Sequence, residues 1–259
     1  MTVGEPHPQW IVPDWPAPRE VRALITTRCG GVSSGPFGAS AANDGGMNVG
    51  LKSGDAIENV HANRALLHAL LPGEPRWLRQ EHGAAVASID LDGAIAVADA
   101  AVSLSPGRVC VVSIADCLPV LLASRKTRAV GAAHAGWRGM AAGVIQNTAA
   151  LMRARLGDAD AELIAYLGPA IGPARFEVGA EVLAAMRVRL PQAELAFSSG
   201  TAGKYYADLF ALARQALAQV GVDQVFGGGD CTFSDPVRFY SYRRDRVTGR
   251  HAALIWIDP

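Results

Sequence analysis

Two long apolar segments near the middle of the chain constrain its fold more than any other feature. Residues 108–124 read RVCVVSIADCLPVLLAS, residues 128–136 read RAVGAAHAG, and a polar stretch separates the two apolar cores. Apolar runs of this length, bounded by a polar turn, are typical of buried β-strands. We therefore expect a strand pair here, and it would carry three reactive side chains into the core: Asp116, Cys117 and His134.

The rest of the chain mixes strand and helix patterns. Strands are predicted at Val21–Thr27, around Gln80 and His82, in residues 161–167, and in a C-terminal hairpin centred on Val247–Gly249. Helical spacing of apolar residues predicts helices over Asp55–Leu71 and Gly139–Leu156, and within 177–190 and 207–221. This mixture favours an α/β or α+β fold with a mixed sheet. Since no repeat or low-complexity linker divides the chain, we expect one domain over residues 1–259.

Composition excludes several classes of protein. Half of the residues are hydrophobic, so a large core can form, and 24 basic residues balance 24 acidic ones. A chain without net charge is not expected to bind nucleic acid, and no apolar segment reaches the length of a membrane helix. The N-terminus has no signal-peptide pattern and the four cysteines are scattered, which predicts a cytoplasmic protein. Either a monomer or a homodimer is compatible with these features.

His82, Cys117 and His134 together offer two nitrogen ligands and one sulfur ligand. A catalytic zinc site uses three protein ligands and keeps one position open. Taken singly, Cys117 is typical of a core residue and His82 of a surface position, whereas an imidazole among small residues at 134 needs a polar partner. Without a metal, Cys117 could be a thiolate nucleophile with His134 as its base. The residues alone leave both chemistries open.

Several long motifs follow one another along the chain. They include TTRCGGVSSGP, WLRQEHG, ADCLPVLL, GAAHAGWRG, LGPAIGPARFEVG and FYSYRRDRVTGR. In type and order they resemble the YfiH-like laccase-domain family, whose members are also described as purine nucleoside phosphorylases. The resemblance covers nearly the whole chain. The segment ASAANDGGM, residues 39–47, departs from the shorter stretch of the family, so the roles of Asn43 and Asn48 stay open.

The resemblance implies a fold, a cofactor and an activity. The fold is an α/β sandwich with flanking helices, related to bacterial cysteine-hydrolase-like toxins. The cofactor is a catalytic zinc ion held by His82, Cys117 and His134. The activity is phosphorolysis of purine nucleosides such as adenosine, inosine and methylthioadenosine, with adenosine deamination at the same site, in the cytoplasm.

Phosphorolysis requires an anion site, a purine site and proton transfer. Asp116, beside the metal ligand, is the candidate for proton transfer and joins Cys117 and His134 as a catalytic residue. Guanidinium groups match phosphate oxygens, and Phe176 or Tyr242 could stack on a purine. The candidate substrate-binding residues are Arg28, Asn48, Arg64, Gln80, Arg138, Phe176, Arg243 and Arg244.

Two other activities compete with this prediction. A blue-copper centre also uses two histidines and one cysteine, so a copper polyphenol oxidase is conceivable, but the histidines outside the trio do not pair closely enough for an oxygen-reducing cluster. These are His7, His61, His68 and His251. Copper is therefore less favoured than zinc. The resemblance also extends to related proteins linked to amidase action in the editing of peptidoglycan precursors, and the thiolate chemistry would fit such an activity. A structural zinc site would need a fourth ligand.

Overall fold

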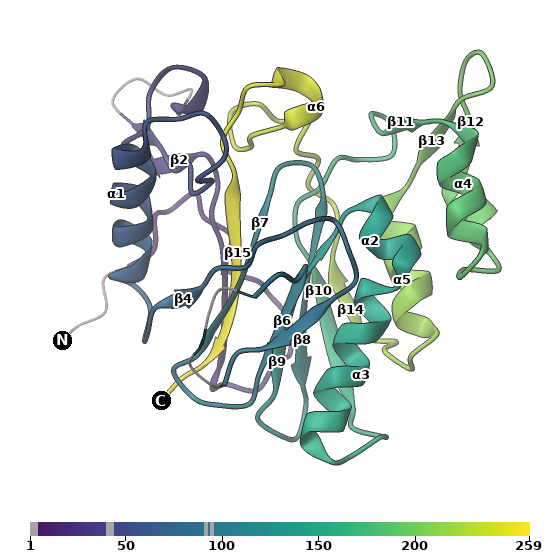
Figure 1. Ribbon diagram of the computed structural model, residues 1–259, viewed down its shortest axis with the longest axis horizontal. Coiled ribbons are helices and arrows are strands. Elements are labelled where there is room, and N and C mark those ends of the chain that lie inside the picture. Colours follow the sequence, from purple (N-terminus) through teal and green to yellow (C-terminus); the bar gives the residue numbers. More distant parts are fainter. Residues whose placement is uncertain (1–4, 40–43, 91–92, 94–95) are drawn as a thin grey trace.

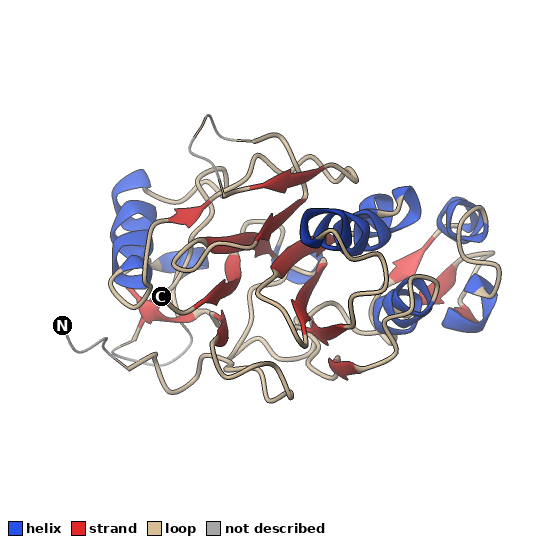
Figure 2. Ribbon diagram, turned by 90° about the horizontal axis from the view of Figure 1, so that it is seen from below, coloured by secondary structure: helices blue, strands red, loops and turns tan. Residues whose placement is uncertain are grey.

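The structure is a computed structural model that describes residues 5–39, 44–90, 93 and 96–259. Two β-sheets pack face to face, and helices cover the outer face of each sheet (Figure 1). Figure 2 shows the same layers from below, with the strands between the helices on either side. The predicted mixed-sheet sandwich with flanking helices is confirmed. None of the described helices is long and apolar enough to cross a membrane.

The first sheet has four strands in the order β1-β15-β7-β4. Their bounds are Val21–Ile25 for β1, His251–Ile257 for β15, Val109–Ile114 for β7 and Pro75–Arg76 for β4. Strand β15 runs antiparallel to both β1 and β7, and β4 runs parallel to β7. Helix α1, Ile57–His68, lies on the outer face, where Leu67 packs with Leu254 and Trp256 of β15.

The second sheet has six strands in the order β14-β10-β8-β9-β6-β5. Their bounds are Val225–Gly227, Leu163–Leu167, Leu118–Ser124, Val130–Ala135, Ala100–Ser103 and Val86–Ser88, in that order. Helices α2, α3 and α5 cover its outer face, at Trp137–Ala142, Val144–Leu156 and Leu209–Ala218. The predicted strand pair on either side of the polar turn at Arg125 forms as β8 and β9, which run antiparallel.

Side chains of β8 alternate between the two cores, as successive residues of a strand must. Leu121 and Ala123 pack against the four-stranded sheet, whereas Val120 and Leu122 pack against the helices. Every residue of β8 and β9 is buried. A strand buried on both faces reads as a continuous apolar run, which is why the central segments are so uniform in the sequence.

Smaller elements complete the fold. A two-stranded sheet pairs β2, Cys29–Gly31, with β3, Gly45–Gly46. A three-stranded sheet contains β11, Glu177–Val178, β13, Tyr205–Ala207, and β12, Phe197–Ser199. The remaining helices are α4, Ala180–Arg187, α6, Tyr242–Asp245, and the 3-10 turns η1, Gly35–Phe37, and η2, Ala193–Ala196.

Four predicted elements are wrong. The apolar run 108–124, expected as one strand of a pair, is divided into β7 and β8. The helix expected over Gly139–Leu156 is divided at Gly143, whose φ of +95° closes α2 before α3 begins. The C-terminal hairpin does not form, because β15 pairs with β1 and β7 while the preceding segment turns into α6. The strand expected around Gln80 and His82 is a turn, described below with the site.

His251, the first residue of β15, is a fully buried histidine that accepts a hydrogen bond from the backbone N–H of Tyr240 through Nε2, at 2.9 Å. This acceptor role requires a neutral ring. Burial also disfavours the charged ring, and it lowers the pKa of His251 to about 3.

The folded state should lose stability as the pH falls, because His251 binds a proton in the unfolded chain at pH values where the buried ring stays neutral. The contribution is complete above the ordinary pKa of 6.5 and is lost as the pH falls towards 3. At pH 4.5 the loss should be about 2–3 kcal/mol relative to pH 7.5. The variant His251→Gln keeps an acceptor but cannot titrate, so its unfolding free energy in urea should fall less between these pH values. An equal fall in wild type and variant would contradict the assignment.

Candidate active site

The connection between β7 and β8 crosses from one sheet to the other. The apolar run 108–124 is therefore two strands rather than one, with Asp116 and Cys117 in the sharp turn between them. Asp116 has a φ of +85°, a left-handed conformation that is uncommon for a residue other than glycine. Its carboxylate accepts hydrogen bonds from Thr232 Oγ1 and the Arg243 backbone N–H, both at 2.6 Å. These bonds hold the turn that places Cys117 at one end of the sandwich.

The pairing of β8 with β9 brings Cys117 next to His134. Pro119 lies opposite His134, and the register continued by two residues sets Cys117 opposite Gly136. Cys117 and His134 are then diagonal neighbours on the same face of the sheet. Gly136 is required there, because a Cβ atom would lie 2.9 Å from the Cys117 Sγ and 3.3 Å from the His82 Cδ2.

The carboxylate of Asp99 holds His82 next to His134 through hydrogen bonds to both residues. Its carboxylate accepts hydrogen bonds from the backbone N–H groups of Glu81, His82 and Gly83 at 3.1, 2.9 and 2.7 Å. The same carboxylate is 2.8 Å from Nδ1 of His134. His82 itself has a φ of +61°. A single buried carboxylate thus holds both the turn that carries His82 and the imidazole of His134.

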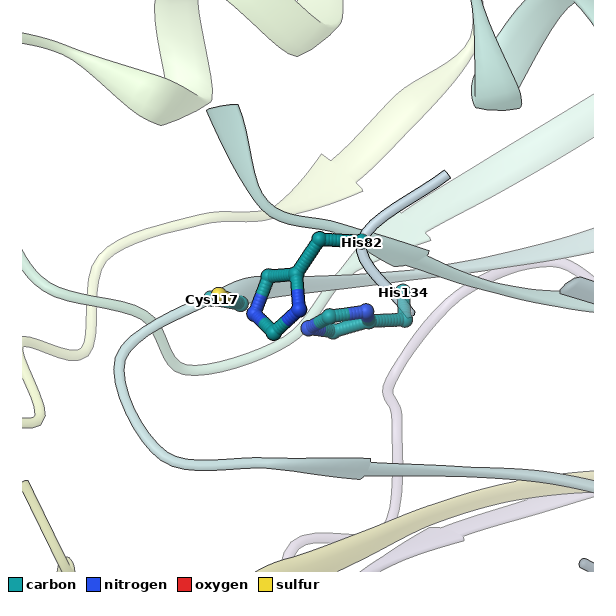
Figure 3. A group of neighbouring side chains, drawn as sticks. All are labelled: His82, Cys117 and His134. Carbon is teal, nitrogen blue, oxygen red and sulfur yellow. The ribbon is translucent and has the colours of Figure 1, made fainter. Parts of the chain in front are cut away.

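The side chains of the trio point toward one another (Figure 3). Their ligand atoms all lie within 4.8 Å of one another, and the rings of His82 and His134 meet edge to face with centroids 4.9 Å apart. The sequence prediction that His82, Cys117 and His134 converge agrees with this geometry.

A negative charge on Cys117 and a positive charge on His134 stabilise each other. Burial alone would raise the pKa of the Cys117 thiol, but the charge and hydrogen bonds of His134, and then of His82, lower it to about 6. Burial would likewise lower the pKa of His134, whereas the Cys117 thiolate and the hydrogen bond to Asp99 raise it to about 9. These interactions favour the thiolate form of Cys117, which is the form that binds metals and attacks electrophiles.

The donor set fits a metal ion. Two imidazoles and a thiolate are ligands that zinc and copper both accept. The Asp99 carboxylate takes Nδ1 of His134, so Nε2 is directed to the centre, and a carboxylate behind a ligating histidine is a common feature of metal sites. The trio could therefore hold a metal ion with three protein ligands.

The trio opens into a large cavity of about 1110 Å³. Six basic side chains and several aromatic ones line it, although the chain as a whole carries no net charge. The basic residues are Lys52, Arg64, Arg79, Arg138, Arg243 and Arg250. Of the predicted substrate-binding residues, those at the cavity are Arg64, Gln80, Arg138, Phe176 and Arg243, together with Tyr242. Such a cavity favours a ligand with an anionic part and a flat apolar part.

The three other predicted substrate-binding residues do not line the cavity. Arg28 donates hydrogen bonds to the carbonyls of Gly38 and Pro236. Arg244 donates to three carbonyls and to Asp245. Asn48 is fully buried. Asn43, also left open by the sequence, lies outside the described residues.

Gln80 and Phe176 lie at the cavity with partners of their own. The Gln80 amide donates to the Ser113 carbonyl at 3.0 Å and accepts from the Ser113 N–H and hydroxyl, which ties the His82 turn to β7. The guanidinium of Arg243 lies 5.3 Å from the centroid of the Phe176 ring.

Sequence reasoning missed several residues of the site, among them Asp99, Arg250 and Trp77. Asp99 directly precedes the buried strand β6, and an acidic residue at that position is a signal that could have been followed. Arg250 ends the motif FYSYRRDRVTGR, from which only Arg243 and Arg244 were predicted to bind substrate. Trp77 follows β4 and lies beneath the guanidinium of Arg64, 3.8 Å from its ring centroid.

Fold and site together define a class of protein: a mixed α/β sandwich with a His-Cys-His ligand group at the end of a cationic cavity. The model of the family described as multi-copper polyphenol oxidoreductase laccase matches residues 22–258, and the chain belongs to this family.

Curated relatives and solved structures agree with this assignment. The chain is 47% identical to a Pseudomonas aeruginosa protein named purine nucleoside phosphorylase, over 96% of this chain and 98% of that one. It is 46% identical to the Escherichia coli purine nucleoside phosphorylase YfiH, over 95% and 98%. The crystal structure of Neisseria meningitidis protein NMB0706 superposes with a TM-score of 0.87 at 44% identity, covering 97% of this chain and all of that one. YlmD from Geobacillus stearothermophilus gives 0.84 at 30% identity, covering 93% of each. The resemblance to YfiH-like proteins is confirmed.

Proposed function

We propose that this protein is a zinc-dependent purine nucleoside phosphorylase. The observation that carries the proposal is the position of the His82-Cys117-His134 group at the end of a cavity lined by basic and aromatic side chains. The names of the P. aeruginosa and E. coli relatives support the reaction type. The proposed substrates are purine nucleosides and inorganic phosphate.

In the proposed reaction a phosphate oxygen forms a bond to the ribose C1′ while the bond from C1′ to the purine N9 breaks. The electron pair of the broken bond leaves with the base, which takes up a proton, and ribose 1-phosphate remains. A zinc ion bound by the trio would supply Lewis acidity beside the substrate. Arginines of the cavity bind the phosphate, and Phe176 and Tyr242 offer apolar faces for the purine.

The role of Asp116 in proton transfer stays a prediction. Its two carboxylate oxygens accept hydrogen bonds from Thr232 and from the Arg243 backbone, which supports a positioning role for the turn that carries Cys117.

Finer parts of the proposal follow the resemblance. Adenosine deamination would use the same centre, with water replacing the amino group at purine C6 and ammonia leaving. The chain would act as one domain over residues 1–259, in the cytoplasm, as a monomer or a homodimer.

A cysteine hydrolase is the second candidate function. The lowered pKa of Cys117, about 6 beside His134, favours it, because a thiolate next to an imidazolium is the activated nucleophile of cysteine enzymes. An amide of a peptidoglycan precursor would then be the substrate. A multi-copper oxidase has less support, since among the described residues the trio is the only group of three or more His, Cys or acidic side chains that could hold a metal ion.

Metal analysis combined with a purine-release assay tests the proposal. We expect one zinc per chain and release of hypoxanthine from inosine only when phosphate is present. Chelation should abolish release and added zinc should restore it. Purine release that survives removal of the metal but not the substitution Cys117→Ala would contradict the zinc-dependent mechanism and favour a thiolate mechanism at Cys117.

A further inference from the structure

The basic side chains of the cavity differ in how they are held. Arg79 is exposed and forms an ion pair with Glu81 at 2.9 Å. Arg138 is exposed and lies over the Trp137 ring, and Arg243 donates to the Glu177 carbonyl. Arg64, Arg243 and Arg250 are partly buried, and no carboxylate of the described residues pairs with their guanidiniums. Arg64 and Arg250 differ from Arg243 because both are also hydrogen-bonded to one short backbone segment, residues 48–50.

Arg64 enters the cavity from α1. Its Nε donates to the Val49 carbonyl at 3.0 Å, and its guanidinium lies on the Trp77 ring. Within the described part of the chain the two Nη groups have no hydrogen-bond acceptor. These donors are therefore available to a ligand.

Arg250 enters from the segment before β15. Its Nη1 donates to the carbonyls of Thr248 and Gly249 at 2.9 and 3.0 Å, and among the described residues Nε and Nη2 have no acceptor. Burial lowers the pKa of Arg250, whereas the negative charges of Cys117 and Asp116 partly raise it, which agrees with a guanidinium near the trio. Burial also lowers the pKa of Arg64, to about 10.

The segment Asn48–Gly50 connects the two arginines. The carbonyl of Val49 accepts from Arg64, and the N–H of Val49 donates to the carbonyl of Arg250 at 3.1 Å. Gly50 leaves room for the Arg250 side chain, because a Cβ atom would lie 2.6 Å from its Cγ. Arg64 and Arg250 are therefore both hydrogen-bonded to the same short segment, and both line the cavity.

Asn48 holds this segment from behind. Its Oδ1 accepts from the backbone N–H groups of Arg250 and Gly50 at 2.8 and 3.0 Å. Its Nδ2 donates to Ser53 Oγ and to Asp55 Oδ2 at 2.8 and 2.9 Å. Asn48 is fully buried and does not line the cavity, so it can affect a ligand only through the residues that it holds there: Gly50, Ser53 and Arg250.

Two partly buried guanidiniums without a carboxylate partner are suited to an oxyanion, because each presents several N–H donors in a fixed plane. We propose that Arg64 and Arg250 form the phosphate-binding subsite of this cavity, and that Asn48 is the residue that positions Arg250. The assignment to the phosphate co-substrate rests on the proposed phosphorylase function.

The variants Arg64→Gln and Arg250→Gln test the subsite. Each should raise the KM for phosphate about 10- to 100-fold, because charge-assisted hydrogen bonds are lost. The KM for inosine should change less than about threefold, and the zinc content should stay at the wild-type level. Arg187→Gln is the control, since it removes a positive charge that is paired with Glu194 outside the cavity, and its phosphate KM should stay within about twofold. Should Arg250→Gln fail to fold, Arg250→Lys keeps the charge and should give an intermediate increase.

A binding measurement separates the subsite from the reaction. Inorganic phosphate should raise the thermal unfolding midpoint of the wild-type holoenzyme, and this shift should be lost in both variants. If wild type shows the shift but releases no purine, the phosphorylase function fails and the subsite stands. If wild type phosphorolyses inosine while both variants keep the wild-type KM for phosphate, the subsite is wrong and the function stands. No phosphate-dependent shift in wild type also overturns the subsite.

Asn48→Ala tests the positioning role. The phosphate KM should rise about fivefold or more while the inosine KM is retained, and in the Arg250→Gln background the substitution should add little, because coupled residues are not additive. A fully additive increase, or equal increases in both KM values, would assign Asn48 a general structural role instead.

Discussion

Cys117→Ala is expected to reduce phosphorolysis by at least about 10³-fold in kcat/KM, because a metal ion contributes several kcal/mol to such reactions. The trio would lose its only sulfur ligand, and the two remaining imidazoles would lack the thiolate charge that raises the pKa of His134. The zinc content of the purified variant should fall well below one per chain. Steady-state kinetics with inosine and phosphate and elemental analysis of the same preparation measure both effects.

Cys231→Ser is the matched control for Cys117→Ala. Cys231 is also a free cysteine of intermediate exposure, but it accepts a hydrogen bond from the Gly172 N–H at 3.2 Å and does not belong to the trio. Zinc content and kcat/KM should stay close to wild type in this variant. A Cys117→Ala protein that keeps both its zinc and its activity would remove the trio from the mechanism.

Asp99→Asn is expected to weaken zinc binding by about 10- to 100-fold, the usual effect of losing a carboxylate behind a ligating histidine. An amide cannot accept all four hydrogen bonds that the carboxylate now receives from three backbone N–H groups and from His134. The turn that carries His82 and the ring of His134 should both lose their fixed orientation. Zinc titration of the metal-free protein against a chelator of known affinity gives the ratio.

Asp90→Asn separates this effect from a loss of general stability. Asp90 is a second poorly exposed carboxylate that accepts from Ser103 Oγ and from the backbone N–H of Leu104, at 2.6 and 3.0 Å. Its substitution should lower the unfolding free energy by about 1–3 kcal/mol, as for other lost buried hydrogen bonds, without changing the affinity for zinc. If both variants lose zinc to the same extent, Asp99 acts through stability alone.

Much of the fold and of the metal-binding group could be predicted from the sequence. The residues of β8 and β9 are apolar without interruption because both faces of these strands are buried, and that pattern is local. The trio His82, Cys117 and His134 was found through its residue types and the family motifs that contain them. The division at Gly143 was missed, since its apolar neighbours continue the helical spacing across the break.

The chain's own residues determined which strands are buried, which family it belongs to and which three side chains form the ligand group, because each of these is written in local pattern or motif. Tertiary structure decided how the site is held and which cations face the cavity. Asp99 is linked to His134 across 35 positions and Asn48 to Arg250 across 202. Arg28 and Arg244, equally basic in the sequence, donate to backbone carbonyls and, for Arg244, to Asp245 as well. A hydrogen bond between distant segments depends on where both partners lie after folding, and no local pattern carries that information.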